Sequence, residues 1–171
     1  VLFRSLETFN LEYPDAFRYY MATSAPCGRD GNYSDDDLMA FIETTNYMFE
    51  FHNHETLAHT ITTAEIAKFL AKQFRLSDAR TEEIYIAGLV HDIGKLRVPA
   101  SILTSPHSLV GDELTIMRKH VEYTKEILEG SFSDNVIAIA SNHHERLDGS
   151  GYPQGLTERD LSIGDKIIMV D

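Results

Sequence analysis

The sequence contains little cysteine, little positive charge and no long apolar run. Among its 171 residues there is one cysteine, Cys27, so no disulfide forms within the chain and a reducing compartment such as the cytoplasm is expected. Fifteen Lys and Arg stand against 27 Asp and Glu, and the resulting net charge of −12 opposes binding to DNA or to an acidic membrane surface. No apolar run approaches the roughly 18 residues that cross a bilayer, so no membrane segment is expected in this chain.

The apolar residues that are present recur at helical spacing, and no alternating pattern indicates a β-strand, so we predict an all-α fold. Residues 1–33 lack sustained periodicity and are predicted to form a loose segment, of which residues 1–5 resemble the translated end of a sequencing adapter. Helices are predicted over 34–52, 53–74, 81–92, 112–129 and 135–144, with a last apolar run from residue 165 and loops over 94–111 and 145–163. Gly94 is predicted to end the third of these helices, and Ser133 or Asp134 to cap the fifth.

Two histidine-rich motifs predict one metal site. His91-Asp92 supplies an imidazole and a carboxylate, and His143-His144 supplies two further imidazoles. This mixture of nitrogen and oxygen donors is one that iron, manganese and zinc accept. Asp92 is predicted to bridge two ions, because carboxylate-bridged pairs of metals recur in phosphate-ester hydrolysis.

Two more histidines are predicted to point inward from helices. His59 shares a helical stripe with Ile66 and Leu70, and His120 lies on the same side of its helix as Leu128. Both are therefore candidates for the same site.

Around these motifs the sequence resembles the HD-GYP family of metal-dependent phosphohydrolases. The strings that carry the resemblance are His91-Asp92-Ile93-Gly94-Lys95 and the run from His143-His144-Glu145 to Gly151-Tyr152-Pro153. It covers roughly residues 53–171 and implies an HD-domain helical bundle, preceded by an N-terminal helical extension with residues 34–52 as a linker helix. We expect the domain to be C-terminally incomplete, because the family continues beyond Asp171 into helices whose Arg and Lys hold substrate phosphates. Thr124 is a departure, since glycine is common at that position.

The resemblance implies two divalent metal ions, iron or manganese, and some members of the family hold a third. Its implied ligands are His59, His91, Asp92 and Asp171 for one ion, and Asp92, His120, His143 and His144 for the other. Glu55 is either a ligand of a third ion or an exposed glutamate in a first helical turn. Most members carry one more residue before the aspartate that matches Asp171.

The activity implied by the resemblance is hydrolysis of cyclic di-GMP to pGpG and GMP. Asp92 and Lys95 are the implied catalytic residues, and Lys95, Arg146 and the Gly151-Tyr152-Pro153 loop are the substrate-contacting residues. The loop would also contact signalling partners, and both monomer and dimer are left open. Two alternatives remain: a non-catalytic nucleotide-binding or scaffolding module, and an HD phosphohydrolase acting on another nucleotide.

Overall fold

The computed structural model describes residues 40, 42, 44 and 54–169, with the side chains of 54–57 excluded. The contacts divide the chain into two units, Val1–Thr44 and Thr45–Asp171, and the fold below is that of the second. Residues 40, 42 and 44 are helical, while the rest of the predicted helix 34–52 and the predicted loose segment 1–33 lie outside the described residues. The described part of the second unit contains helices and one isolated bridge between Asp148 and Thr157, which confirms the all-α prediction.

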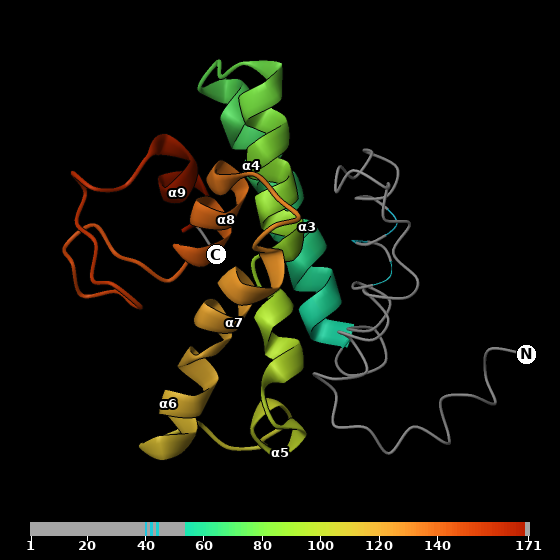
Figure 1. Cartoon of the computed structure of the whole chain (residues 1–171), viewed down its shortest axis with the longest axis vertical. Coiled ribbons are helices and arrows are strands. Elements are labelled where there is room, and N and C mark those ends of the chain that lie inside the picture. The colour runs from blue at the N-terminus through green and yellow to red at the C-terminus, as the bar shows by residue number, and fades with distance from the viewer. Residues whose placement is uncertain (1–39, 41, 43, 45–53, 170–171) are drawn as a thin grey trace, which may run out of the picture. The chain divides into compact units, whose positions relative to one another are not determined.

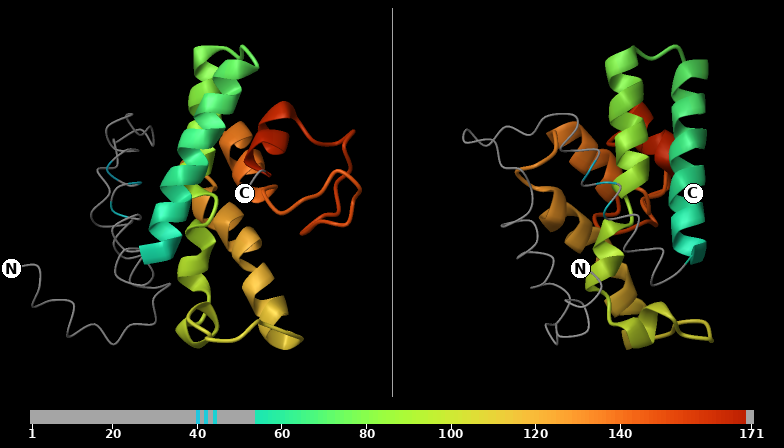
Figure 2. Two further views of the ribbon diagram at one scale, coloured as in Figure 1. Left: turned by 180° about the vertical axis from the view of Figure 1, so that it is seen from behind. Right: turned by 90° about the vertical axis from the view of Figure 1, so that its right-hand side faces the viewer.

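Two helices, α3 (His54–Gln73) and α4 (Asp78–Val90), lie side by side and are joined at one end of the domain (Figure 1; Figure 2). Small residues allow their close approach: Ala64, Ala67 and Ala71 are buried on α3, and an added Cβ on Gly88 of α4 would lie 2.7 Å from Ala64 Cα. Ile61 and Phe74, which are at helical spacing with these alanines, are 46% and 59% exposed, so the contact is made mainly by the small residues.

The second helix of this pair begins earlier than the predicted Thr81. Ser77 is its N-cap, and the Ser77 side chain accepts a hydrogen bond from the Arg80 N–H, which satisfies one of the free donors of the first turn. The helix ends at Val90, so His91 and Asp92 lie in the turn that follows rather than within the predicted helix 81–92.

The predicted loop over 94–111 contains two short helices, the 3₁₀-helix η2 (Ile93–Arg97) and α5 (Ala100–Leu103). The prediction that Gly94 ends a helix was wrong, because Gly94 lies buried inside η2. A Cβ at this position would overlap the backbone carbonyl of His120, so glycine is required there for close packing.

The predicted helix 112–129 is divided at Lys119 into α6 (Asp112–Arg118) and α7 (His120–Leu128). Next comes α8 (Asp134–Ser141), for which the predicted Ser133 cap is confirmed, since its side chain accepts from the Val136 N–H. This helix ends three residues before the predicted His144, so the histidine pair lies in a turn. A long loop leads to α9 (Ile163–Ile168), which begins with a capping box between Ser162 and Asp165.

The core forms where α4, η2, α7, α8 and α9 meet. Its largest apolar side chains, all at most 2% exposed, are Ile84, Val90, Ile93, Val121, Leu128, Ile139 and Ile168. Burying an aliphatic side chain of this kind stabilises a fold by about 1.5–3 kcal/mol. Among the described residues, no helix combines the length and the apolar composition that a membrane-spanning helix needs.

Candidate metal centre

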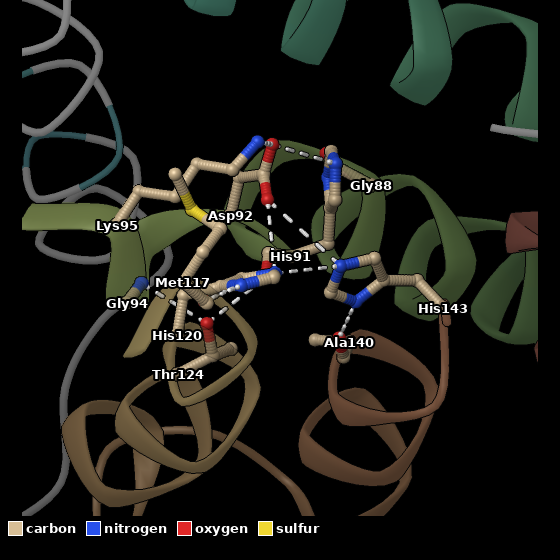
Figure 3. Close-up of polar contacts among 10 residues, drawn as sticks. All are labelled: Gly88, His91, Asp92, Gly94, Lys95, Met117, His120, Thr124, Ala140 and His143. Carbon is tan, nitrogen blue, oxygen red and sulfur yellow. Dashed lines mark hydrogen bonds and ion pairs between the residues drawn. The ribbon is translucent and has the colours of Figure 1, made fainter. Parts of the chain in front are cut away.

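Asp92 lies at the centre of the histidine cluster and is 2% exposed. Its Oδ2 lies 2.6 Å from Lys95 Nζ and 3.4 Å from His91 Nε2. Its Oδ1 lies 3.5 Å from His120 Nε2 and 3.8 Å from His143 Nε2. Figure 3 shows the carboxylate of Asp92 pointing toward these rings, with the Lys95 side chain approaching its other oxygen. One carboxylate therefore connects imidazoles from three separate segments of the chain.

Three of the imidazoles are oriented in the same way, each just beyond the end of a helix. The Nδ1 of each ring bonds the carbonyl oxygen three residues back: His91 to Gly88 at 2.8 Å, His120 to Met117 at 2.7 Å and His143 to Ala140 at 2.7 Å. A carbonyl oxygen only accepts, so each Nδ1 carries the hydrogen. In a neutral ring, Nε2 then presents a lone pair toward Asp92 or a neighbouring ring.

This arrangement fits a bound cation. Burial lowers the pKa of His120, and lowers that of His143 further, which favours the neutral rings. The Nε2 atoms of these two rings are only 3.2 Å apart, so their lone pairs face each other at close range. Within the described residues, Asp92 Oδ1 is buried and accepts no hydrogen bond. A divalent ion among these atoms would satisfy all three, because neutral imidazole nitrogens and a carboxylate oxygen are its usual ligands.

Asp92 is well suited to bind a cation. Burial alone raises the pKa of its carboxyl group, but the neighbouring His91 and the Lys95 ammonium lower it, and the net pKa is well below the usual range. The carboxylate is therefore ionised at neutral pH. The ends of α4 and α8 also contribute the negative side of their helix dipoles, which favours a cation at this place.

The structure brings six of the eight predicted ligands together in two groups. The groups are His59, His91 and Asp92, and His120, His143 and His144, and within each the ligand atoms lie within 4.8 Å of one another. The five histidines divide between the groups as they were assigned to the two ions, while Asp92, which was assigned to both ions, is in one group only. The side chain of Glu55 and the whole of Asp171 lie outside the described residues.

His59 is more open than predicted. Its ring lies 5.7 Å from that of His91, yet the residue is exposed, as is Ile66 on the stripe that it was predicted to share. The alanine face of α3 packs on α4, so the stripe of His59 lies at the edge of the contact. His59 therefore borders the cluster from its accessible side.

The predicted Gly-Tyr-Pro loop lies beside the histidine pair. The ring of Tyr152 stacks on that of His144 at 4.8 Å, and the Tyr152 N–H donates to the His144 carbonyl at 3.1 Å. Gly151 passes so close to the backbone of Glu145 that a Cβ would overlap it. Pro153 and Arg146 are exposed.

Several residues around the cluster were missed by sequence reasoning. The Arg118 guanidinium lies 4.9 Å above the Tyr152 ring, a cation–π contact that places positive charge near the histidine pair. The 2% exposed carboxylate of Glu145 accepts from the Gln154 N–H at 2.7 Å and the Leu156 N–H at 2.9 Å, which fastens the loop. No spacing or motif in the sequence indicates these long-range contacts.

A second missed link lies immediately before the histidine pair. Asn142 Nδ2 donates to Asp165 Oδ1 at 3.0 Å, and Asp165 Oδ2 accepts from the Ser162 N–H at 2.7 Å within the capping box. This link ties the turn that carries His143 to the start of α9. The Ser162-x-x-Asp165 spacing predicts the helix cap from the sequence. No sequence pattern predicts the contact between Asp165 and Asn142.

The fold and the cluster define a class: an all-α domain with a buried aspartate surrounded by histidines from several helices. The chain belongs to the HD domain family, whose model matches residues 43–171. It is 37% identical over 139 residues to a cyclic di-GMP phosphodiesterase of Thermotoga maritima, covering 80% of this chain and 38% of that protein. It is 39% identical over 136 residues to a 3'3'-cGAMP-specific phosphodiesterase of Vibrio cholerae, covering 79% of this chain and 32% of that protein.

The fold is also similar to a solved structure. An HDG"Y"P protein from Bdellovibrio bacteriovorus matches with a TM-score of 0.59 and 19% sequence identity, over 92% of this chain and 53% of that chain. These comparisons confirm the resemblance to the HD-GYP family. The chain spans about a third of the length of the curated relatives named above.

Proposed function

We propose that this chain is the catalytic domain of a metal-dependent phosphodiesterase that hydrolyses cyclic di-GMP. The observation that carries the proposal is the buried Asp92 carboxylate, with histidine groups on both sides and ligand atoms at metal-binding spacing. The relatives named as cyclic dinucleotide phosphodiesterases support the substrate class. The whole protein's activity is part of the proposal, since the chain covers only part of each relative.

The proposed ligands of one ion are His59, His91, Asp92 and Asp171, and those of the other are Asp92, His120, His143 and His144. Glu55 is proposed for a third ion. Iron or manganese is proposed because both accept mixed imidazole and carboxylate ligands. When bound, such ions supply Lewis-acid activation of a water molecule and neutralise the charge of the phosphoryl oxygens.

In the proposed reaction, a water oxygen attacks one phosphorus of the cyclic dinucleotide and the P–O3′ bond breaks, giving linear pGpG. A second hydrolysis gives GMP. The Lys95 ammonium, now 2.6 Å from Asp92 Oδ2, is close enough to the ligand cluster to pair with a phosphate oxygen. Arg146 and the Gly151-Tyr152-Pro153 loop are proposed to contact the substrate at the rim.

A mixed cyclic dinucleotide is a second candidate substrate. The observation that favours it is the 39% identity to a 3'3'-cGAMP-specific phosphodiesterase, which is as high as the identity to the cyclic di-GMP relative. Metal ligands bind phosphate and do not select bases, so the cluster is compatible with both. Cytoplasmic location, which the single cysteine supports, and signalling partners at the Gly-Tyr-Pro loop are also proposals.

The test uses the purified full-length protein loaded with Mn²⁺, or with Fe²⁺ under anaerobic conditions. Metal content is measured by mass spectrometry, and cyclic di-GMP, 3'3'-cGAMP and linear pGpG are offered separately with products separated by chromatography. We expect two or more ions per chain and linear product from a cyclic dinucleotide. Asp92→Asn should lose both metal and turnover, while Asp134→Asn, at an exposed carboxylate of α8, should retain both.

Two results would refute the proposal. A metal-loaded full-length protein that turns over none of the three nucleotides is not a phosphodiesterase of this class. Tight binding of cyclic di-GMP without hydrolysis would instead identify the non-catalytic nucleotide-binding module.

A further inference from the structure

We infer that Thr124 is a positioning residue, which sets the distance between the turn that carries Asp92 and the helix that carries His120. The residue is fully buried on α7. Its hydroxyl donates to the His91 carbonyl at 2.9 Å and accepts from the Gly94 N–H at 3.0 Å. One side chain thus uses both its donor and its acceptor on the same short segment.

The two backbone groups that Thr124 contacts lie on either side of Asp92. The hydroxyl therefore holds both ends of the turn on which the central carboxylate stands. Thr124 also follows His120 by four residues, so both side chains lie on the same face of α7. The two hydrogen bonds consequently fix the position of Asp92 relative to His120, whose Nε2 lies 3.5 Å from Asp92 Oδ1.

The backbone packing at this point leaves little freedom for another arrangement. A Cβ on Gly94 would overlap the carbonyl oxygen of His120, so η2 and α7 are in direct backbone contact here. Without the hydroxyl, the remaining polar links that the described residues make between η2 and α7 outside the histidine cluster would be those of Arg97, which pairs with the exposed Glu126 carboxylate and lies 4.3 Å from the Tyr123 ring. Neither of these contacts involves the turn that carries Asp92. Thr124 lies outside the His-Asp and Gly-Tyr-Pro strings, so the link is not part of the signature motifs.

The inference rests on the proposed metal centre. The test below distinguishes a failure of the inference from a failure of the metal centre. The variants are Thr124→Val, which removes the hydroxyl at nearly constant volume, and Thr124→Ser, which keeps it. The control is Thr81→Val on α4, because Thr81 is 4% exposed and its hydroxyl has no hydrogen-bond partner in the described part of the chain. Each protein is titrated with Mn²⁺ by calorimetry and melted without metal.

We expect Thr124→Val to bind Mn²⁺ about 10- to 100-fold more weakly, which is the usual loss when a residue that orients metal ligands is removed. Thr124→Ser and Thr81→Val should bind like the wild type. A lower melting temperature for Thr124→Val with unchanged Mn²⁺ affinity would mean that the hydroxyl acts on stability alone, and would overturn the inference.

The remaining outcomes are also decisive. If the wild type binds Mn²⁺ and Thr124→Val binds it equally, the inference fails and the metal centre stands. If the wild type binds no Mn²⁺, the metal centre fails and the inference fails with it. If Thr124→Val does not fold, Thr124→Ser decides: wild-type affinity supports a role for the hydroxyl, and weakened affinity overturns it.

Discussion

Replacing Glu145 by Gln tests how the Gly-Tyr-Pro loop is held against the domain. The carboxylate is 2% exposed and accepts two backbone hydrogen bonds, from Gln154 and Leu156. An amide of the same shape keeps one acceptor oxygen and turns an NH₂ group toward the other N–H donor. A hydrogen bond to a charged group contributes about 1.5–3 kcal/mol. We therefore expect a loss of about 2–3 kcal/mol, or roughly 5–10 °C in melting temperature for a domain of this size.

The assay combines thermal unfolding by circular dichroism with limited trypsin digestion. Arg146 and Arg159 are exposed at the two ends of the loop, so a loosened loop should be cut there faster. The matched control is Asp148→Asn in the same loop, because that carboxylate is exposed and its hydrogen bonds to Ser150 are local. The control should melt and digest like the wild type. A Glu145→Gln protein with the wild-type melting temperature would refute the reasoning, as would an equal loss in the control.

Three further predictions concern the histidine cluster. Asn142→Ala should reduce the free energy of unfolding by about 1–3 kcal/mol, because it leaves the buried Asp165 oxygen without its donor; urea titration measures this, and an unchanged midpoint would contradict it. Gly94→Ala should reduce it by about 3 kcal/mol, since the new methyl group overlaps the His120 carbonyl; a wild-type melting curve would show that the contact is not rigid. In metal-free protein, stability should fall as the pH drops below about 6.5, the ordinary histidine pKa, because His120 and His143 have lowered pKa values and the unfolded chain then binds protons that the folded one does not. Urea midpoints at several pH values check this, and a flat profile from neutral pH to pH 5 would exclude it.

The helices that carry the cluster could largely be predicted, because their apolar spacing and their caps are local signals. Ser133 is a clear N-cap, and the loop after His144 is marked by its glycines and proline. The break at Lys119 could not be predicted, since no glycine or proline stands between Asp112 and Glu129. It depends on contacts that only the folded domain provides.

The sequence names six of the residues that the structure brings together in the cluster, but not the contacts that hold them in place. Adjacent His-Asp and His-His pairs name the donors, and the spacing of His120 on its helix points it inward. The exposed position of His59 was missed because the pattern does not tell which of two neighbouring stripes will meet α4. Thr124, Asn142 and Glu145 were missed because hydrogen bonds to distant backbone or side-chain groups leave no periodic trace in a sequence.

In the three histidines that follow helix ends, His91, His120 and His143, a backbone carbonyl determines which ring nitrogen carries the hydrogen. Each Nδ1–H donates to a carbonyl oxygen in a last helical turn, the region in which an α-helix leaves carbonyl groups without an intrahelical partner. No carboxylate or amide side chain is needed to select the tautomer of these rings. The tautomer of these three rings therefore depends on where each helix ends and not on the identity of a particular side-chain partner.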